Sequence, residues 1–280
     1  MRRWIWSGII ILIIGGIAAA WPSVHRALTT ATDSVTSVIS PQPDLRFAVI
    51  SDNHGDSPIY SRLLDDMATK PFAFVLHLGD ASDRGTNEEW AAVRAQEERL
   101  RLPVYHTVGN HDIKVDPTRA AFEQAFSTTR WYSKNFSNVH LVVLDNADRK
   151  VGFPVEELDW LERDLAAHAN DILLIAYHRP FGLPFAEYTG DDETTASRLT
   201  NERFQSIIAP YTITQIFNGH VHTYLPYTFN GIPAVVTGGG GDPAQTLLGG
   251  GDSSYFHYLD VSITDSKLTY RSVGLPTTPE

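Results

Sequence analysis

The chain has 280 residues and no cysteine, and its 33 acidic side chains outnumber 22 Lys and Arg, for a formal net charge of -11. The lack of cysteine excludes disulfides and thiolate metal ligands, and the acidic balance argues against binding of nucleic acid through a basic surface. An anionic substrate would need a local cationic site, such as bound metal ions, to attract it.

The first 21 residues predict a segment that associates with a membrane. Residues 4–21 contain no charged side chain, and Arg2 and Arg3 precede them. A helix of this length can cross a bilayer, and the two arginines predict a cytoplasmic N-terminus. A signal peptide cleaved near the alanines at 18–20 is the alternative. The rest of the chain is expected outside the cytoplasm, held by a single-pass anchor, or secreted or periplasmic after cleavage.

Residues 22–44 are rich in Ser, Thr, Ala and Pro and predict a linker. From 45 to 275 short apolar strands alternate with amphipathic helices, and the last part is a run of strands. This pattern indicates one α/β domain, in which two sheets are flanked by helices. Strands are predicted first at 45–50, 72–78, 103–108, 172–177 and 213–217, and helices at 57–70, 87–100, 117–126, 154–169 and 196–211.

Five of the predicted strands are each followed by a short segment rich in Asp, Asn, His and Gly. The segments read SDNHGD, GDASDRG, GNHD, YHRPF and NGHVHT. Taken singly, these residues have ordinary explanations, since Asp52 could cap a turn and His178 could be a hydrogen-bonded interior histidine. Ligands of open α/β sheets bind beyond the carboxyl ends of the strands, however. Five such strand ends therefore predict one shared site.

Together the five segments resemble the calcineurin-like metallophosphoesterase superfamily. Its signature is D-x-H, G-D-x-x-D, G-N-H-D/E, a single His and G-H-x-H, and all five blocks occur here in that order between positions 52 and 222. The resemblance implies a four-layer α-β-β-α sandwich of two mixed sheets, with a metal site at the carboxyl ends of the strands. It also implies a hydrolase acting on phosphoric ester bonds, either a phosphatase or a phosphodiesterase.

The resemblance further implies two divalent metal ions that share the carboxylate of Asp80. The other ligands fall into two sets of three: Asp52, His54 and His222 for one metal, and Asn110, His178 and His220 for the other. Such donors suit Mn, Fe or Zn better than Ca. Two ions of this kind lower the pKa of a bridging water and clamp a phosphoryl group. The expected activity is hydrolysis of phosphate mono- or diesters by a metal-bridging hydroxide.

Three more residues receive roles from the resemblance. His111 would contact the substrate and protonate the leaving oxygen, and Asp83 would hydrogen-bond His111 and raise its basicity. Arg84, together with Asn110 and His111, would bind the phosphoryl group. Purple acid phosphatases of the wider superfamily carry a tyrosine at the position of Asp83, so a tyrosinate-bound iron is not expected here.

The remaining histidines are expected to be structural. His77, His106 and His140 lie inside predicted strands, and His25, His168 and His257 have no partners in the pattern. Gly79, Gly109 and Gly219 each precede a predicted ligand, where a tight turn is expected. The glycine-rich stretch at 238–251 is expected to form either a loop at the rim of the substrate pocket, together with residues 180–192, or a plain linker between strands.

Two alternatives stay open at this stage. A scaffold that keeps the fold for protein interaction and has lost catalysis would be expected to lack ligands, whereas all seven ligands and His111 are present here. The choice between monoesters and diesters is undecided. The membrane segment favours a small-molecule or lipid-linked phosphate ester as the substrate. No nucleic-acid partner is expected, and the oligomeric state is unknown.

Overall fold

The computed structural model describes residues 44–55, 57–183, 194–242 and 255–275. These residues all belong to one compact unit, Pro41–Glu280. The predicted anchor or signal peptide at 1–21 lies outside the described residues, as does the predicted linker except for Asp44, so both stay predictions. Within the described ranges, none of the helices combines the length and apolar character needed to span a bilayer.

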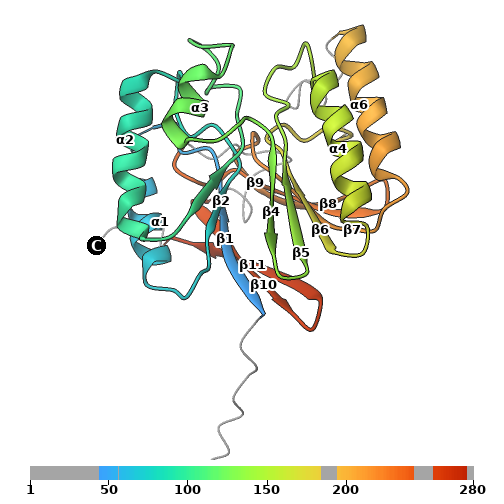
Figure 1. Ribbon diagram of the computed structural model, residues 1–280. Coiled ribbons are helices and arrows are strands. Elements are labelled where there is room, and N and C mark those ends of the chain that lie inside the picture. Colours follow the sequence, from blue (N-terminus) through green and yellow to red (C-terminus); the bar gives the residue numbers. More distant parts are fainter. Residues whose placement is uncertain (1–43, 56, 184–193, 243–254, 276–280) are drawn as a thin grey trace, which may run out of the picture. The chain divides into compact units, whose positions relative to one another are not determined.

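Two mixed sheets form the centre of the unit (Figure 1). The first has the order β11-β10-β1-β2-β3, in which β1, β2 and β3 are parallel. Its strands are β1 (Leu45–Ile50), β2 (Val75–His77), β3 (Val104–His106), β10 (His257–Thr264) and β11 (Lys267–Gly274). The antiparallel strands of this sheet thus come from the end of the chain.

The second sheet has the order β4-β5-β6-β7-β9-β8, with β5, β6, β7 and β9 parallel and the two edge strands antiparallel. Its strands are β4 (Tyr132–Phe136), β5 (Val139–Val143), β6 (Ile172–Ala176), β7 (Ile213–Asn218), β8 (Tyr224–Phe229) and β9 (Ile232–Thr237). A two-residue turn joins β4 to β5, and Ser137 in this turn has a φ of 56°.

Helices cover the outer face of each sheet. Figure 1 shows α1, α2 and α3 on one side, and α4 and α6 on the other. Their bounds are α1 (Pro58–Ala68), α2 (Asn87–Glu97, continued by a 3-10 turn at Glu98–Leu100), α3 (Ala120–Phe126), α4 (Val155–Ala167) and α6 (Thr195–Ile208). The predicted fold class, a layered α/β arrangement of two mixed sheets between helices, is confirmed.

The apolar core follows these layers. Phe47 and Phe74 of the first sheet pack against Phe217 and Leu174 of the second, so one cluster fills the space between the sheets. A second cluster joins the second sheet to α4 and α6, and a third joins the first sheet to α1. The pleated alternation of strand side chains explains why residues one apart enter different clusters.

The elements differ from the predictions mainly at their ends. Strands predicted at 72–78 and 103–108 shorten to Val75–His77 and Val104–His106, so β2 loses three predicted residues at its start and one at its end, and β3 loses one at its start and two at its end. A turn follows β2. At Gly79 this turn has a φ of 91°, which glycine adopts readily. The helix predicted from 117 starts at Ala120, since Arg119 before it is left-handed with a φ of 66°.

Candidate metal centre

The turns that follow the strands hold four predicted ligands in an unusual backbone conformation. Asp52, His54, Asp80 and His220 have φ values of 63°, 50°, 51° and 72°. A residue other than glycine pays on the order of 1–3 kcal/mol for such a conformation, and it persists only where the surroundings hold it. Four such residues at neighbouring strand ends are typical of a functional site.

Two glycines allow these turns to approach one another. A Cβ on Gly109 would lie 2.1 Å from the backbone nitrogen of Asp80, and one on Gly219 would lie 2.1 Å from Ser51 Oγ. Of the three glycines predicted in tight turns, only Gly79 has a positive φ. Gly109 is needed because the backbone of Asp80 lies so close, and Gly219 because the side chains of Ser51 and Asp52 do.

The first set of predicted ligands comes together across both sheets. Asp52 and His54 follow β1, and His222 lies between β7 and β8. Their candidate ligand atoms all lie within 4.8 Å of one another. His222 Nε2 is 3.6 Å from Asp52 Oδ1, and the Asp52 side chain is fully buried.

The second set is arranged around Asp80. The ligand atoms of Asp80, His178 and His220 also lie within 4.8 Å of one another. His178 Nε2 is 3.2 Å from Asp80 Oδ2 and 3.1 Å from Asn110 Oδ1. Because Asp80 Oδ2 also lies 3.5 Å from His54 Nε2, this carboxylate stands between the two sets. The grouping therefore matches the predicted division of His220 and His222, although their role as ligands stays a prediction.

The chemistry of this donor set fits divalent cations. Two carboxylates, Asp52 and Asp80, are buried within the same small space. Burial raises the pKa of Asp52, whereas for Asp80 the effect of burial is outweighed by His178, which holds the pKa well below its usual range. Burial also lowers the pKa of His178, but Asp80 outweighs this and raises it to about 9. A positive charge is thus favoured next to the Asp80 carboxylate.

A second observation supports the same fit. His54 Nε2 is buried and has no hydrogen-bond partner among the described residues. A buried polar atom without a partner costs free energy, and a metal ion is one partner that a ring nitrogen accepts. Imidazole nitrogens with carboxylate and amide oxygens suit Mn, Fe or Zn. The residues would therefore accept the two ions that the sequence pattern implies.

Asp112 connects two of the turns that carry ligands. Its Oδ2 accepts hydrogen bonds from the backbone nitrogens of Asp80 (2.9 Å) and Gly109 (2.8 Å), and its Oδ1 accepts from the nitrogen and the hydroxyl of Ser82 (both 2.9 Å). The sequence offered no role for this residue. The structure shows that it ties the turn after β3 to the turn after β2.

His111 and Asp83 meet as predicted. His111 Nδ1 lies 3.0 Å from Asp83 Oδ1, and the His111 ring lies 4.0 Å from that of His54. Lys114, which the sequence interpretation missed, places its Nζ 2.7 Å from the same Nδ1. Burial lowers the pKa of His111. His111 also forms a group with His54 and Asp80 whose ligand atoms lie within 4.8 Å.

The two arginines near the site differ in position. Arg84 is exposed, and its backbone nitrogen donates to Glu89 Oε2 at 3.1 Å, so its predicted contact with substrate remains a prediction. Arg179 is buried, and its Nη1 donates to Asn110 Oδ1 at 3.1 Å. The sequence interpretation passed over Arg179, although it directly follows His178 in YHRPF.

Two other histidine clusters are structural. His77 Nδ1 accepts the backbone N–H of Gly79 at 3.3 Å, and its Nε2 contacts Asn53 Oδ1 at 2.8 Å, so it braces two ligand turns from behind. His140 and His168 both contact Asp164. Their rings are stacked 3.7 Å apart at 11°, and lone pairs that lie in parallel planes cannot converge on one ion.

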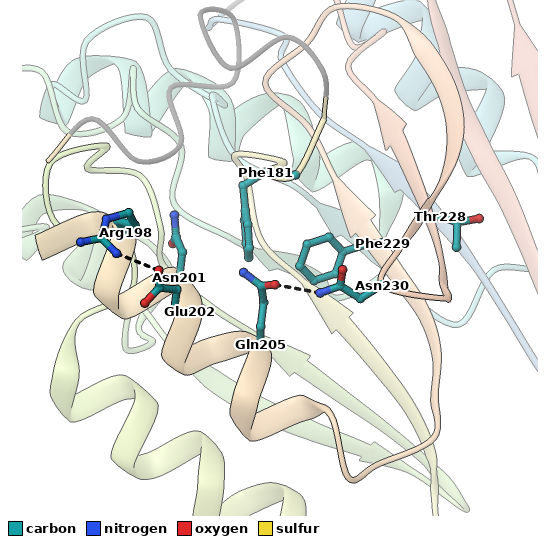
Figure 2. A pocket seen from close by; sticks show the side chains of 9 residues that line it. Phe181, Arg198, Asn201, Glu202, Gln205, Thr228, Phe229 and Asn230 are labelled. Atoms are coloured by element: carbon teal, nitrogen blue, oxygen red, sulfur yellow. Dashed lines mark hydrogen bonds and ion pairs between the residues drawn. The ribbon is translucent and has the colours of Figure 1, made fainter. Parts of the chain in front are cut away.

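The pocket in Figure 2 lies elsewhere, on the helical side of the second sheet, and measures about 200 Å³. It is lined by residues of α6, the β8–β9 turn and Phe181–Gly182: Phe181, Gly182, Arg198, Asn201, Glu202, Gln205, Thr228, Phe229 and Asn230. Its polar groups pair with one another, as in the 2.8 Å contact between Arg198 and Glu202. None of the predicted site residues lines it. Of the predicted rim, residues 184–192 and 243–251 lie outside the described ranges.

Comparison with known proteins agrees with this geometry. The model of the calcineurin-like phosphoesterase family matches residues 45–224. The chain is 27% identical to purple acid phosphatase 15 of Arabidopsis thaliana over 139 residues, 44% of this chain and 25% of that protein. It is 25% identical to a probable glycerophosphodiester phosphodiesterase, GpdQ, of Arcobacter nitrofigilis over 172 residues, 57% of this chain and 59% of that one. It thus spans about a quarter of the first relative's length and less than two thirds of the second's.

A solved structure shows the same fold. A dimetal phosphatase from Danio rerio superposes with a TM-score of 0.65 at 15% identity, covering 83% of this chain and 97% of that chain. At this identity the likeness concerns the fold alone. The match of the family model covers well over half of the chain, however, and includes both sets of predicted ligands. The chain therefore belongs to the calcineurin-like phosphoesterase family.

Proposed function

We propose that this protein is a phosphoric-ester hydrolase that works with two divalent metal ions. One observation carries the proposal: two groups of buried and partly buried candidate ligands meet at Asp80, where the strand ends of two sheets converge. Family membership supports the ester class, and relatives named as a phosphatase and as a phosphodiesterase leave both ester types open. Metal ions in such a site activate water and neutralise the phosphoryl oxygens.

The residues of the chain divide the remaining work. His111 stands above His54 with its Nδ1 between Asp83 and Lys114, so its Nε2 is the nitrogen left to deliver a proton to the leaving oxygen. Arg179 holds the amide of Asn110 from the buried side and adds positive charge next to a predicted ligand. Asp112 keeps both turns in register by its four hydrogen bonds.

The substrate and the location form the finer part of the proposal. Residues 1–21 would anchor the chain in the membrane, with the catalytic unit outside the cytoplasm. In this position a lipid-linked phosphate ester, or a small-molecule ester outside the cytoplasm, is the substrate class that fits best. Mn, Fe and Zn are the candidate metals.

The test is an activity screen of the full chain loaded separately with Mn, Fe or Zn. Nitrophenyl phosphate, a bis-nitrophenyl diester, a nucleotide and a lipid phosphate would be compared. Asp80→Asn and His178→Ala should lower turnover by about 10³-fold or more, since metal ions contribute several kcal/mol of transition-state stabilisation.

Asp65→Ala is the matched control, because Asp65 lies on the exposed face of α1 and pairs with Arg99 at the surface. It should leave turnover unchanged. Full activity in both site variants would contradict the proposed centre, and inactivity of the wild type on all esters with every metal would contradict the proposed activity.

A further inference from the structure

Asp242 contacts two of the predicted ligands with one carboxylate oxygen. Its Oδ2 lies 3.0 Å from His222 Nδ1 and 3.6 Å from His54 Nδ1. The other nitrogen of each ring faces a buried carboxylate. His222 Nε2 is 3.6 Å from Asp52, and His54 Nε2 is 3.5 Å from Asp80. Both rings therefore turn Nδ1 toward Asp242 and Nε2 toward the interior of the site.

The chemistry of imidazole makes this arrangement directional. A neutral ring carries its hydrogen on one nitrogen and a lone pair on the other, and the partner of the first nitrogen decides which is which. A carboxylate accepts hydrogen bonds, so Asp242 favours the hydrogen on Nδ1. The lone pair is then left on Nε2, where a metal ligand needs it. The 3.0 Å contact has hydrogen-bond length, whereas the 3.6 Å contact is longer, so His222 is held more directly than His54.

The backbone fixes Asp242 in this place. Its nitrogen donates to the carbonyl of Asp52 at 3.0 Å, and the nitrogen of Gly240 donates to the carbonyl of Ser51 at 2.7 Å. A Cβ on Gly240 would lie 2.2 Å from that same carbonyl oxygen, so the segment needs glycine to run this close to the turn after β1. The first residues of the glycine-rich stretch thus act as a support for one carboxylate.

At the other predicted metal position, a group of another kind orients His178. There His178 Nδ1 lies 2.7 Å from the main-chain carbonyl of Leu78, which takes the same orienting role. His178 is therefore oriented by a different kind of group from His54 and His222, whose rings Asp242 contacts directly.

We infer that Asp242 is a positioning residue that orients His54 and His222 and sets the metal affinity of the Asp52–His54–His222 position. The inference rests on the proposed metal centre and adds a residue and a site preference to it. Loss of an orienting partner of a metal ligand typically weakens metal binding 10- to 100-fold. The Asp242 side chain is 33% exposed, so a substitution there leaves the apolar core intact.

The test titrates Zn²⁺ or Mn²⁺ into the metal-free full chain by isothermal titration calorimetry. Wild type should bind two ions per chain. Asp242→Ala should weaken one of the two binding events by about 10- to 100-fold and leave the other unchanged. The affinity of Asp242→Asn for this ion should lie between those of wild type and Asp242→Ala, because its amide oxygen still accepts a hydrogen bond but carries no charge.

Asp65→Ala is again the control, and circular dichroism would verify that each variant is folded. Unchanged affinities in Asp242→Ala, or equal weakening of both events, would overturn the inference. If wild type binds two ions but hydrolyses no ester, the proposed activity fails while the role of Asp242 stands. If wild type binds no ion, the proposed centre and this inference fall together.

Discussion

The two halves of the candidate metal centre each contain two predicted histidine ligands, but these histidines are held in different ways. In the half around His178, the ring is fully buried and a main-chain carbonyl orients it. In the half around His222 and His54, the side chains are 9% and 11% exposed, and the orienting group is the carboxylate of Asp242. A main-chain carbonyl survives every substitution, whereas a side chain can be removed. The second half is therefore the one that sequence variation can tune.

The halves are also linked. The backbone nitrogen of His220 donates to both oxygens of Asp52, at 3.1 and 3.0 Å, although the two residues belong to different predicted ligand sets. Asp80 forms a second link, because it lies near both His54 and His178. Experiments that separate the halves must therefore change ring nitrogens and leave these two carboxylates in place.

The largest effect is expected from removing one ring from each half. His220→Ala and His222→Ala should each abolish a different binding event in a calorimetric metal titration. The loss of metal affinity should exceed the 10- to 100-fold expected when an orienting partner is removed. Turnover should fall by about 10³-fold in both variants. If both variants lost the same binding event, the division of the site into two halves would be wrong.

A smaller effect is expected from His111, whose ring lies over the His54 half. His111→Ala should lower turnover of an alkyl phosphate about 100-fold, the low end for loss of a general acid. Both metal affinities should stay unchanged. Nitrophenyl phosphate serves as the internal control, since its leaving group departs without needing a proton. A drop in metal affinity would instead identify His111 as a ligand, in line with its closeness to His54 and Asp80.

The smallest effect is expected on stability at low pH. It concerns His257, which packs against the glycine-rich stretch that carries Asp242. His257 is buried against Gly239, and burial lowers its pKa from 6.5 to about 4. An unfolded chain takes up this proton at higher pH than the folded chain does. The stability that neutral His257 provides is therefore complete above about pH 6.5 and is lost as the pH falls toward 4.

By pH 5 this loss should reach about 2 kcal/mol. His257→Asn should not show this loss of stability, because asparagine does not titrate. Its amide can still donate a hydrogen bond to the carbonyl of Tyr255, as His257 Nδ1 does. Urea unfolding at pH 7 and pH 5 measures the difference. Equal pH dependence in wild type and variant would show that acid does not act on this support through His257.

Much of the site was predictable because its residues lie at strand ends. Apolar runs predict the strands, and the polar residues after each run include Asp52, Asp80 and His178, which the sequence alone therefore places at strand ends. The contacts of Asp242 and Lys114 were not predictable in this way. Asp242 lies in a glycine-rich stretch twenty residues after His222, and only the pairing of that stretch with Ser51 and Asp52 brings it into the site.

Arg84 and Arg179 show a related limit. Both follow predicted site residues closely in sequence, but one is exposed and the other buried. Which side of a turn a long side chain takes depends on the packing of neighbouring elements, and the sequence pattern carries no information about it. The bounds of β2 and β3 depend in the same way on pairing with neighbouring strands.

The predicted ligands come from both sheets, and this has a consequence for how such a centre can arise or be reused. Each ligand set takes members from both sheets, with Asp52 and Asp80 on one and His222 and His178 on the other. Neither sheet alone carries a usable half-site. The centre cannot be transplanted as a module, and any slippage of one sheet past the other would be felt at the metal positions first. Bound ions would thus cross-link the two sheets.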